Sequence, residues 1–294
     1  MSGIERAQQT WDTIDIEQVR SVAWLSVPAV NQDIWQEFSQ LRGPVAVVTD
    51  LLADRGRVDG LAGAALVCGD MQSERMFFER TPRVTFRSVD GYDLSPVSLA
   101  RYIPDGIEWR PHQVDCNRLE LPEAAFDLVV ASHGAHHVQN LDGLFAEARR
   151  SLKPRGLMYM YEWIGPTYLQ IPRRNRFFAR LLLYVLFPGR RMRTTHMGKR
   201  KGIRYLQDPP REFDPSEACN SLQLYPAYAA NFEPLAEYRH GGLTYPMFEG
   251  ISQNLPDDSR TSRRTRFVVR AEKWLTRRGL VHPLFVVAVG ERRP

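Results

Sequence analysis

The chain has 294 residues, a net charge of +5, 43% hydrophobic residues and 25% charged residues. These proportions are typical of a globular protein with a large core, and they exclude a disordered or fibrous chain. No run of 18 apolar residues marks a membrane span, and the polar N-terminus has no signal-peptide pattern. Three scattered cysteines predict neither a disulfide framework nor a metal site. We therefore expect a cytoplasmic protein.

Residues 1–55 are expected to form a helical N-terminal cap. Bulky apolar side chains recur along this stretch at moderately helical spacing. Pro28 is expected to break the helical pattern. Asn31 could then cap a second helix, because its side chain can accept a hydrogen bond from a first-turn N–H group.

From residue 56 to residue 165 the pattern changes to short apolar runs that alternate with amphipathic stretches. The runs span residues 64–68, 84–92, 107–114, 126–131 and 156–161. Each has the length of a buried parallel strand, and the alternation predicts βαβ units. Asn140 can cap the helix after the fourth run, and Pro154 ends it. The predicted fold is α/β: a Rossmann-like, doubly wound, mostly parallel sheet with a helical N-terminal cap and a basic lid insertion.

Residues 166–213 interrupt this alternation as a basic insertion, and residues 214–294 are expected to complete the sheet with a last strand at 285–289. From Arg173 to Arg204 the chain carries 11 Lys and Arg and no Asp or Glu. The insertion could be a lid over an anionic or lipid-linked acceptor, or a peripheral membrane contact through residues 173–204. It could also be a packed helix with a solvated basic face. Nucleic acid is not expected as a partner, because few aromatic residues are interleaved with the charges.

The ends of the predicted strands carry residues suited to a nucleotide-like cofactor. Gly69 follows the first strand, and a glycine turn before a helix lets the backbone approach a ligand. One glycine alone does not distinguish this site from an ordinary turn. Asp93 lies 24 residues after Gly69, a spacing at which an acidic side chain can accept hydrogen bonds from ribose hydroxyls. Asp115 closes the third strand, where it could accept from an adenine amino group or remain a solvated loop residue.

Five segments stand in the order of one known family: residues 91–95, Asp115 with residues 121–122, residues 126–130, residues 135–138, and residues 152–154 with Gly156. Together they resemble the class I S-adenosylmethionine (SAM)-dependent methyltransferases over about residues 60–165. The pattern is similar to a broad group that includes quinone-biosynthesis and small-molecule methyltransferases. Residues 162–166, 214–218, 241–242 and 250–251 resemble a bacterial subgroup associated with glycan and secondary-metabolite gene clusters.

The resemblance implies an enzyme with SAM as cofactor and S-adenosylhomocysteine as product. Its acceptor would be a small molecule, expected to be methylated on an oxygen of a sugar, glycan or secondary metabolite. The residues that we expect to bind the cofactor are Cys68, Gly69, Asp70, Met71, Asp93, Leu94, Asp115, Cys116, Asn117, Ser132 and His133.

Three positions depart from the family pattern. Val67 and Met71 stand where the first loop normally has its outer two glycines, and Arg155 replaces the first glycine of a usual Pro-Gly-Gly. We expect these changes to lower SAM affinity or shift its pose, with Met71 near the methionine end of the cofactor. They leave one rival interpretation, a degenerate fold that serves as a binding or scaffold subunit. A nicotinamide-dependent oxidoreductase is a further alternative, which the segments after Asp93 disfavour.

Methyl transfer is an in-line displacement, so the protein mainly has to position the acceptor. A hydroxyl acceptor is helped by a general base with a pKa near neutrality, a role suited to histidine. His136 is our first candidate base and His133 the second, and Glu162 could also orient or deprotonate an acceptor. The alternative is that the His136–His137 pair only orders the loop. The residues expected to contact the acceptor are His137, Trp163, Tyr168 and Arg173.

Overall fold

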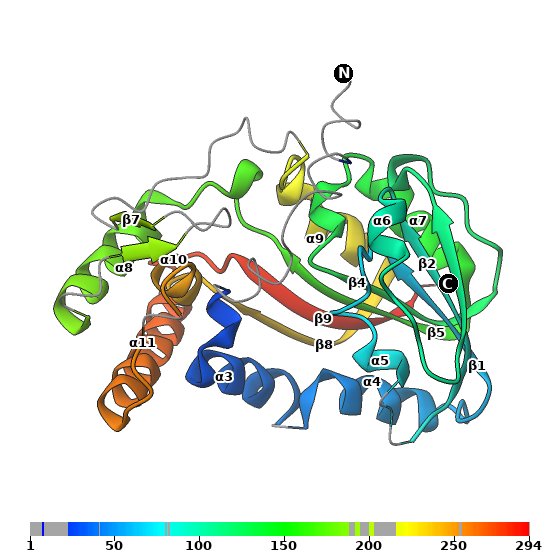
Figure 1. Cartoon of the computed structure of the whole chain (residues 1–294), viewed down its shortest axis with the longest axis horizontal. Coiled ribbons are helices and arrows are strands. Elements are labelled where there is room, and N and C mark those ends of the chain that lie inside the picture. The colour runs from blue at the N-terminus through cyan, green and yellow to red at the C-terminus, as the bar shows by residue number, and fades with distance from the viewer. Residues whose placement is uncertain are drawn as a thin grey trace.

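The computed structural model describes residues 8, 23–40, 42–79, 81, 83–187, 192–194, 200–202, 216–252 and 255–293. Parts of the predicted N-terminal cap and of the basic insertion lie outside these ranges. Within them, a seven-stranded sheet runs through the molecule and carries helices on both faces (Figure 1). The predicted doubly wound α/β class is therefore confirmed.

The sheet has the strand order β3-β2-β1-β4-β5-β9-β8. Its strands are β1 (Leu61–Leu66), β2 (Phe86–Asp93), β3 (Glu108–Gln113), β4 (Phe126–Ser132), β5 (Leu152–Trp163), β8 (Phe232–His240) and β9 (Phe285–Arg292). The first five are parallel, and β9 runs antiparallel between β5 and β8. The strand order reverses between β1 and β4. The loops after these two strands therefore lie at the switch point where open α/β sheets bind their ligands.

Five of the seven strands follow the predicted apolar runs, and β9 extends the predicted last strand to Arg292. No strand is predicted at β8, because this segment contains Pro234 and several charged residues. The structure explains both features. The strand lies at the edge of the sheet, where proline is tolerated, and its side chains alternate between more and less buried positions.

The described part of the N-terminal cap contains η1 (Trp24–Ser26), α3 (Pro28–Ser39) and α4 (Gly43–Ala53). Pro28 occupies the first turn of α3, so it starts this helix and does not break it. Asn31 therefore lies inside the helix, and its predicted capping role is wrong. The apolar face of α3 is buried against the core through Val30, Ile34 and Phe38.

Helices cover both faces of the sheet: α3, α4 and α11 (Ser259–Arg277) on one, α7 (Leu141–Ser151) and α9 (Ser221–Asn231) on the other (Figure 1). Side chains of β4 alternate between the two cores, with Leu128 and Val130 in one and Val129 in the other. Because both faces are buried, the strand reads as a continuous apolar run. Asn140 caps α7 as predicted, accepting a 3.1 Å hydrogen bond from the N–H of Gly143.

The basic insertion contains the helix α8 (Arg173–Leu186), which packs on α10 (Thr244–Phe248). Asn175 anchors it by donating hydrogen bonds to the carbonyls of Gly242 and His282, at 2.9 and 2.7 Å. Among the described helices, none is long and apolar enough to cross a membrane. The shorter elements are α5 (Met76–Glu79), α6 (Pro96–Leu99), η2 (Cys116–Arg118), η3 (Ala135–His137), η4 (Thr167–Leu169), β6 (Met192–Thr194) and β7 (Arg200–Gly202).

Candidate active site

The loop after β1 keeps a left-handed backbone at alternate residues. The φ angles of Val67, Gly69 and Met71 are 51°, 50° and 61°. Glycine adopts this region without cost, whereas a β-branched residue such as valine is strained there. A Cβ placed on Gly69 would meet nothing within 4 Å. The backbone at Gly69 is therefore open to the approach of a ligand.

The two replaced glycines have different surroundings. Val67 lies against the loop after β4, because a Cβ on Gly134 would come within 2.1 Å of the Val67 carbonyl oxygen. Met71 is fully buried in the core beneath the loop. Its side chain therefore points into the protein, so only its backbone remains available to a cofactor. Asp70 lies between Val67 and Met71 in the chain and is half-buried.

Asp93, the last residue of β2, ties this loop to the neighbouring strand. Its Oδ2 accepts a 2.8 Å hydrogen bond from the N–H of Gly69, and its Oδ1 accepts one of 2.8 Å from the N–H of Ser95. Burial raises the pKa of Asp93, although both N–H groups and His137 act to lower it. Each carboxylate oxygen has a second lone pair with which it could accept from a hydroxyl group.

The residues after β3 form a local network. Asp115 Oδ1 accepts hydrogen bonds from the backbone N–H and the side-chain amide of Asn117, at 3.0 and 2.8 Å. Asn117 Oδ1 in turn accepts from the N–H of Gln139 at 2.8 Å, so this amide joins η2 to the start of α7. Burial raises the pKa of the Cys116 thiol to about 12 and that of Cys68 well above its usual value. Both cysteines are therefore neutral at physiological pH.

These features fit the predicted cofactor. Gly69, Asp93 and Asp115 follow β1, β2 and β3, which are neighbours in the sheet. Their side chains or backbone therefore stand in a row at one edge, in the order expected for the methionine, ribose and adenine parts of SAM. Leu94 lies half-buried after Asp93. Whether each of these residues contacts the cofactor stays a prediction.

His133 follows β4 and is half-buried, with its Nε2 atom shielded from solvent. Its Nδ1 lies 3.0 Å from the hydroxyl of Ser132, and its Nε2 has no hydrogen-bond partner in the described part of the chain. Burial lowers the pKa of His133 to about 4. The ring is therefore uncharged at neutral pH, and Nε2 can accept a proton in the tautomer that carries its hydrogen on Nδ1 and donates it to Ser132.

Two rings that the sequence analysis does not single out lie beside His133. The ring centroids of His133 and Tyr161 are 4.4 Å apart, and those of Tyr161 and His240 are 5.5 Å apart. The Tyr161 hydroxyl and both His240 ring nitrogens are buried without a partner among the described residues. Burial, followed by the nearby His133, lowers the pKa of His240 to about 3. The ends of β4, β5 and β8 thus share one buried cluster of unsatisfied polar atoms.

Glu162 organises the loop after β4. Its Oε1 accepts hydrogen bonds from the N–H groups of Gly134 and Ala135, at 2.8 and 2.7 Å, and its Oε2 lies 2.7 Å from Nδ1 of His136. Burial acts to lower the pKa of His136, but Glu162 and Glu217 outweigh it and raise the pKa to about 10. At neutral pH His136 is therefore a cation, a state unsuited to removing a proton.

The four residues predicted to contact the acceptor have different surroundings. His137 joins the site, with Nδ1 2.9 Å from the hydroxyl of Ser216. Trp163 is fully buried in the core, and its indole N–H donates to the carbonyl of Pro166 at 3.1 Å. The N–H of Tyr168 donates to the carbonyl of Ala218 at 3.0 Å. Arg173 is exposed at the start of α8.

Comparison with known proteins adds independent support. Residues 67–160 match the family model described as "Methyltransferase domain". A sterol 24-C-methyltransferase of Gibberella zeae is 38% identical over 52 residues, which is 18% of this chain and 14% of that protein. A sterol 24-C-methyltransferase of Eremothecium gossypii is 36% identical over 50 residues, 17% of this chain and 13% of that protein. The match thus spans about one seventh of the length of these curated relatives.

Solved structures resemble the whole chain. The cyclopropane synthase MmaA2 from Mycobacterium tuberculosis superposes with a TM-score of 0.53 at 15% identity, covering 99% of this chain and 98% of that one. The geranyl diphosphate C-methyltransferase from Streptomyces coelicolor A3(2) gives a TM-score of 0.49 at 14% identity, with 100% and 98% covered. The first likeness shows a shared fold. Residues 67–160 therefore match a methyltransferase domain, within a fold that is shared with a solved methyltransferase-like structure.

Proposed function

We propose that the protein is an enzyme that transfers the methyl group of SAM to a hydroxyl oxygen of a small molecule, such as a sugar, a glycan or a secondary metabolite. The observation that carries this proposal is the unpartnered Nε2 of a neutral histidine, His133, at the end of β4. The following residue, Gly134, packs directly on the loop after β1. The free base is thus next to the predicted methyl donor.

The cofactor would be held by the backbone at Gly69 and by the carboxylates of Asp93 and Asp115. When bound, SAM supplies a methyl group made electrophilic by its positively charged sulfur. Asp93 would accept from the ribose hydroxyls, since its oxygens each retain an acceptor site. Its two backbone hydrogen bonds hold the carboxylate in place before a ligand arrives.

His133 would bind the acceptor hydroxyl and take its proton on Nε2 as the oxygen–methyl bond forms and the sulfur–methyl bond breaks. Tyr161 and His240 would position the acceptor. Each buried polar atom without a partner costs about 1–3 kcal/mol, so a cluster of them calls for a ligand that satisfies it. Positioning of this kind is the main contribution that a protein makes to an in-line displacement.

The degenerate-scaffold alternative rests on the loss of two glycines. Val67 and Met71 nevertheless adopt the left-handed angles that glycine would supply. Such strain costs about 1–2 kcal/mol per residue and persists only where the surrounding structure imposes it. The loop conformation is therefore retained without its usual residues, which favours a working cofactor site.

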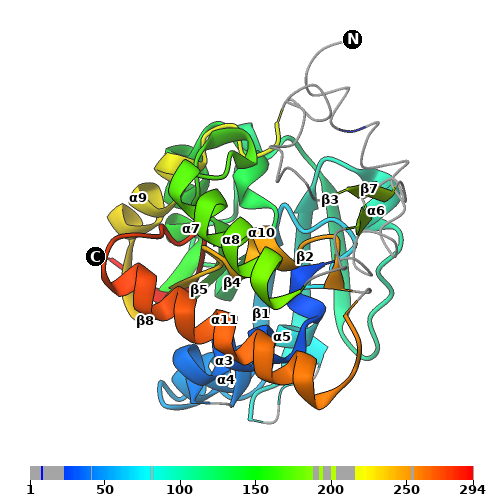
Figure 2. The ribbon, with the colours of Figure 1, turned by 90° about the vertical axis from the view of Figure 1, so that its left-hand side faces the viewer.

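We also propose that the enzyme docks on an anionic lipid surface, which would suit a lipid-linked acceptor. The exposed face of α8 combines arginine with the apolar side chains Phe177 and Leu181, which are 62% and 49% exposed. The neighbouring face of α11 exposes Phe267 and Trp274 among arginines. Both helices lie on the face turned toward the viewer in Figure 2. Basic helices with exposed apolar residues suit a membrane surface.

Calorimetry and product analysis together test the enzymatic proposal. We expect saturable binding of S-adenosylhomocysteine, and transfer of label from methyl-labelled SAM into hydroxyl-bearing compounds of a small-molecule extract. Binding of NAD(P)⁺ in place of S-adenosylhomocysteine would favour the oxidoreductase alternative. S-adenosylhomocysteine binding with no more label transfer than a His133→Asn variant gives would favour the scaffold alternative.

A further inference from the structure

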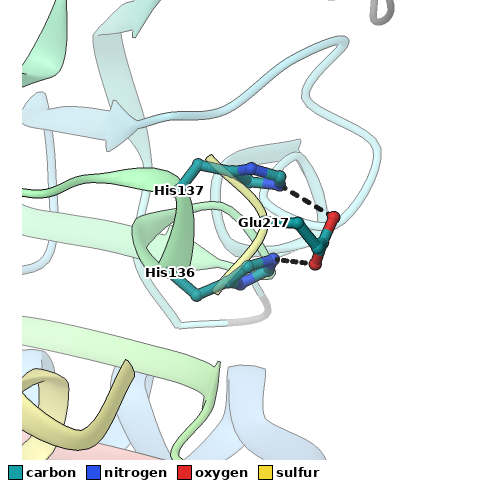
Figure 3. Close-up of side chains that lie close together, drawn as sticks. All are labelled: His136, His137 and Glu217. Atoms are coloured by element: carbon teal, nitrogen blue, oxygen red, sulfur yellow. Dashed lines mark ion pairs between the residues drawn. The ribbon is translucent and has the colours of Figure 1, made fainter. Parts of the chain in front are cut away.

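Two imidazoles and a carboxylate converge beside the loop after β4. His136 and His137 belong to η3, and Glu217 belongs to the turn that precedes α9 (Figure 3). Nε2 of His136 lies 3.3 Å from Oε1 of Glu217, and Nε2 of His137 lies 3.8 Å from Oε2 of the same carboxylate. One ligand atom from each residue can be chosen so that all three lie within 4.8 Å of one another.

The outer nitrogens of both rings already have partners. Nδ1 of His136 lies 2.7 Å from Oε2 of Glu162, and Nδ1 of His137 lies 2.9 Å from the hydroxyl of Ser216. Metal-binding histidines almost always use their second nitrogen in this way, which fixes the ring orientation and raises its basicity. Here the same arrangement aims both Nε2 atoms at Glu217. A metal ion would bind the neutral rings, so its binding would displace the proton that His136 carries in the metal-free protein.

We propose that His136, His137 and Glu217 bind a divalent transition-metal ion of the zinc class. Zinc binds imidazole nitrogen at about 2.0–2.1 Å and carboxylate oxygen at about 2.0–2.2 Å, so two of its ligands lie at most about 4.2 Å apart. The observed separations of 3.3 Å to Oε1 and 3.8 Å to Oε2 fall within that limit. All three ligand atoms lie within 4.8 Å of one another, so movements of a few tenths of an ångström would bring them to zinc-binding distances. Two histidines and one glutamate are a ligand set of zinc sites that keep a fourth position open.

The ligand atoms of His136, His137 and Glu217 also indicate which metal ions the site would prefer. Imidazole nitrogens favour zinc and its transition-metal neighbours, whereas magnesium and calcium favour oxygen ligands alone. The side chains of His136, His137 and Glu217 are 11%, 13% and 23% exposed, so the site is sheltered but reachable from solvent. Three scattered cysteines had predicted no metal site, and this one uses no thiol.

The ion would join two parts of the chain that are about 80 residues apart. One is η3, directly after β4, and the other is the turn before α9. Asp93 lies close enough for His137 to lower its pKa. The metal would therefore fix the turn beside the predicted cofactor site.

The inference is independent of the proposed methyl transfer, and a binding measurement tests it directly. Untagged protein is dialysed against a chelator and titrated with Zn²⁺ in a calorimeter. We expect one equivalent to bind, and a rise in the melting temperature on binding. Glu217→Gln, which keeps the shape of the side chain, should weaken Zn²⁺ binding at least 100-fold. Ser216→Ala, which removes an outer partner, should weaken it about 10-fold.

The matched control is His112→Asn. His112 Nε2 also lies near a carboxylate, 2.8 Å from Oδ1 of Asp90, but it belongs to no cluster of three ligands among the described residues. This variant should bind Zn²⁺ like the wild type. Absence of stoichiometric binding to the wild type would overturn the proposal and identify the cluster as an ion pair. Unchanged binding in Glu217→Gln would also overturn it, and circular dichroism of the metal-free variant shows that it is folded.

Discussion

The imidazole of His133 packs on the ring of Tyr161 with their centroids 4.4 Å apart, and both rings present a buried polar atom that lacks a partner among the described residues. The two side chains come from the ends of neighbouring parallel strands, β4 and β5. This pair locates the proposed acceptor site at the same edge of the sheet as the cofactor loop. The surroundings of His133 thus differ from those of the cationic His136, which lies only three residues further along the chain.

Replacing His133 by Asn should lower the turnover number about 100-fold or more, the low end of general-base contributions. Asparagine removes Nε2 while it can still bond to the Ser132 hydroxyl. Affinity for S-adenosylhomocysteine should stay within twofold, because the change leaves the Gly69–Asp93 contact untouched. Initial rates and calorimetry measure the two quantities. Near-normal turnover would exclude His133 as the base, and His112→Asn serves as the control.

Stability should fall as the pH drops below about 6.5, because His133 and His240 are buried as neutral rings. The pKa values of these residues are lowered to about 4 and about 3, so between these values and about 6.5 the unfolded chain binds more protons. Their contribution is complete above pH 6.5 and is lost as the pH falls toward 4. In His240→Phe, the difference between the numbers of protons bound by the unfolded and the folded chain should be smaller by up to one.

Urea unfolding at pH 7, 6 and 5 measures this effect. In His240→Phe the loss of unfolding free energy should be smaller than in the wild type, by up to about 1.4 kcal/mol per pH unit. Equal pH dependence in His240→Phe and the wild type would show that His240 titrates normally.

Arg155 offers a clean measure of the backbone strain at the replaced glycines. Its φ is 61°, and its side chain is 64% exposed, with Glu291 3.8 Å away. Arg155→Gly should exceed Arg155→Ala in unfolding free energy by about 1 kcal/mol. Left-handed strain of about 1–2 kcal/mol disappears, offset in part by the greater freedom of glycine in the unfolded chain. Both variants lose the same ion pair, so an alanine variant of equal or higher stability would refute the strain.

The proposed lipid surface can be tested by vesicle co-sedimentation. Wild-type protein should sediment with anionic vesicles at low salt and dissociate as salt is added, because screening weakens attraction to the lipid charges. The double variant Phe177→Ser and Leu181→Ser should bind several-fold more weakly. Leu222→Ser on α9, at a residue that is 57% exposed, is the matched control. Equal sedimentation with neutral vesicles, or none at low salt, would exclude this surface.

Much of the fold follows from local sequence. The apolar run 126–131 and the cap at Asn140 appear in the structure almost as predicted, because burial on both faces and helix capping act over short distances. Lys153, in the family segment 152–154, has a structural role. The Nζ of Lys153 lies 2.6 Å from Oδ2 of the buried Asp127, at the opposite edge of the sheet from the site.

The rest of the site depends on contacts that no local pattern encodes. His240 reaches Tyr161 only because β8 pairs with β9, which pairs with β5. Glu217 meets His137 across about 80 residues, and although both lie in segments of the family resemblance, no local pattern shows that they come together. The pair Gly241–Gly242 belongs to the segments that resemble the bacterial subgroup, and His240 lies directly before it without a signal of its own.

If the ends of β1, β2 and β3 bind the cofactor, replacing Asp93 at the end of β2 should weaken that binding. Calorimetric titration of S-adenosylhomocysteine into the wild type and Asp93→Asn measures this directly. Asp90→Asn on the same strand serves as the control. We expect one saturable site per chain, with an affinity about 10-fold or more lower in Asp93→Asn, the loss expected for a hydrogen bond to a charged group. Absence of saturable binding at millimolar ligand, or equal affinity in Asp93→Asn, would contradict it.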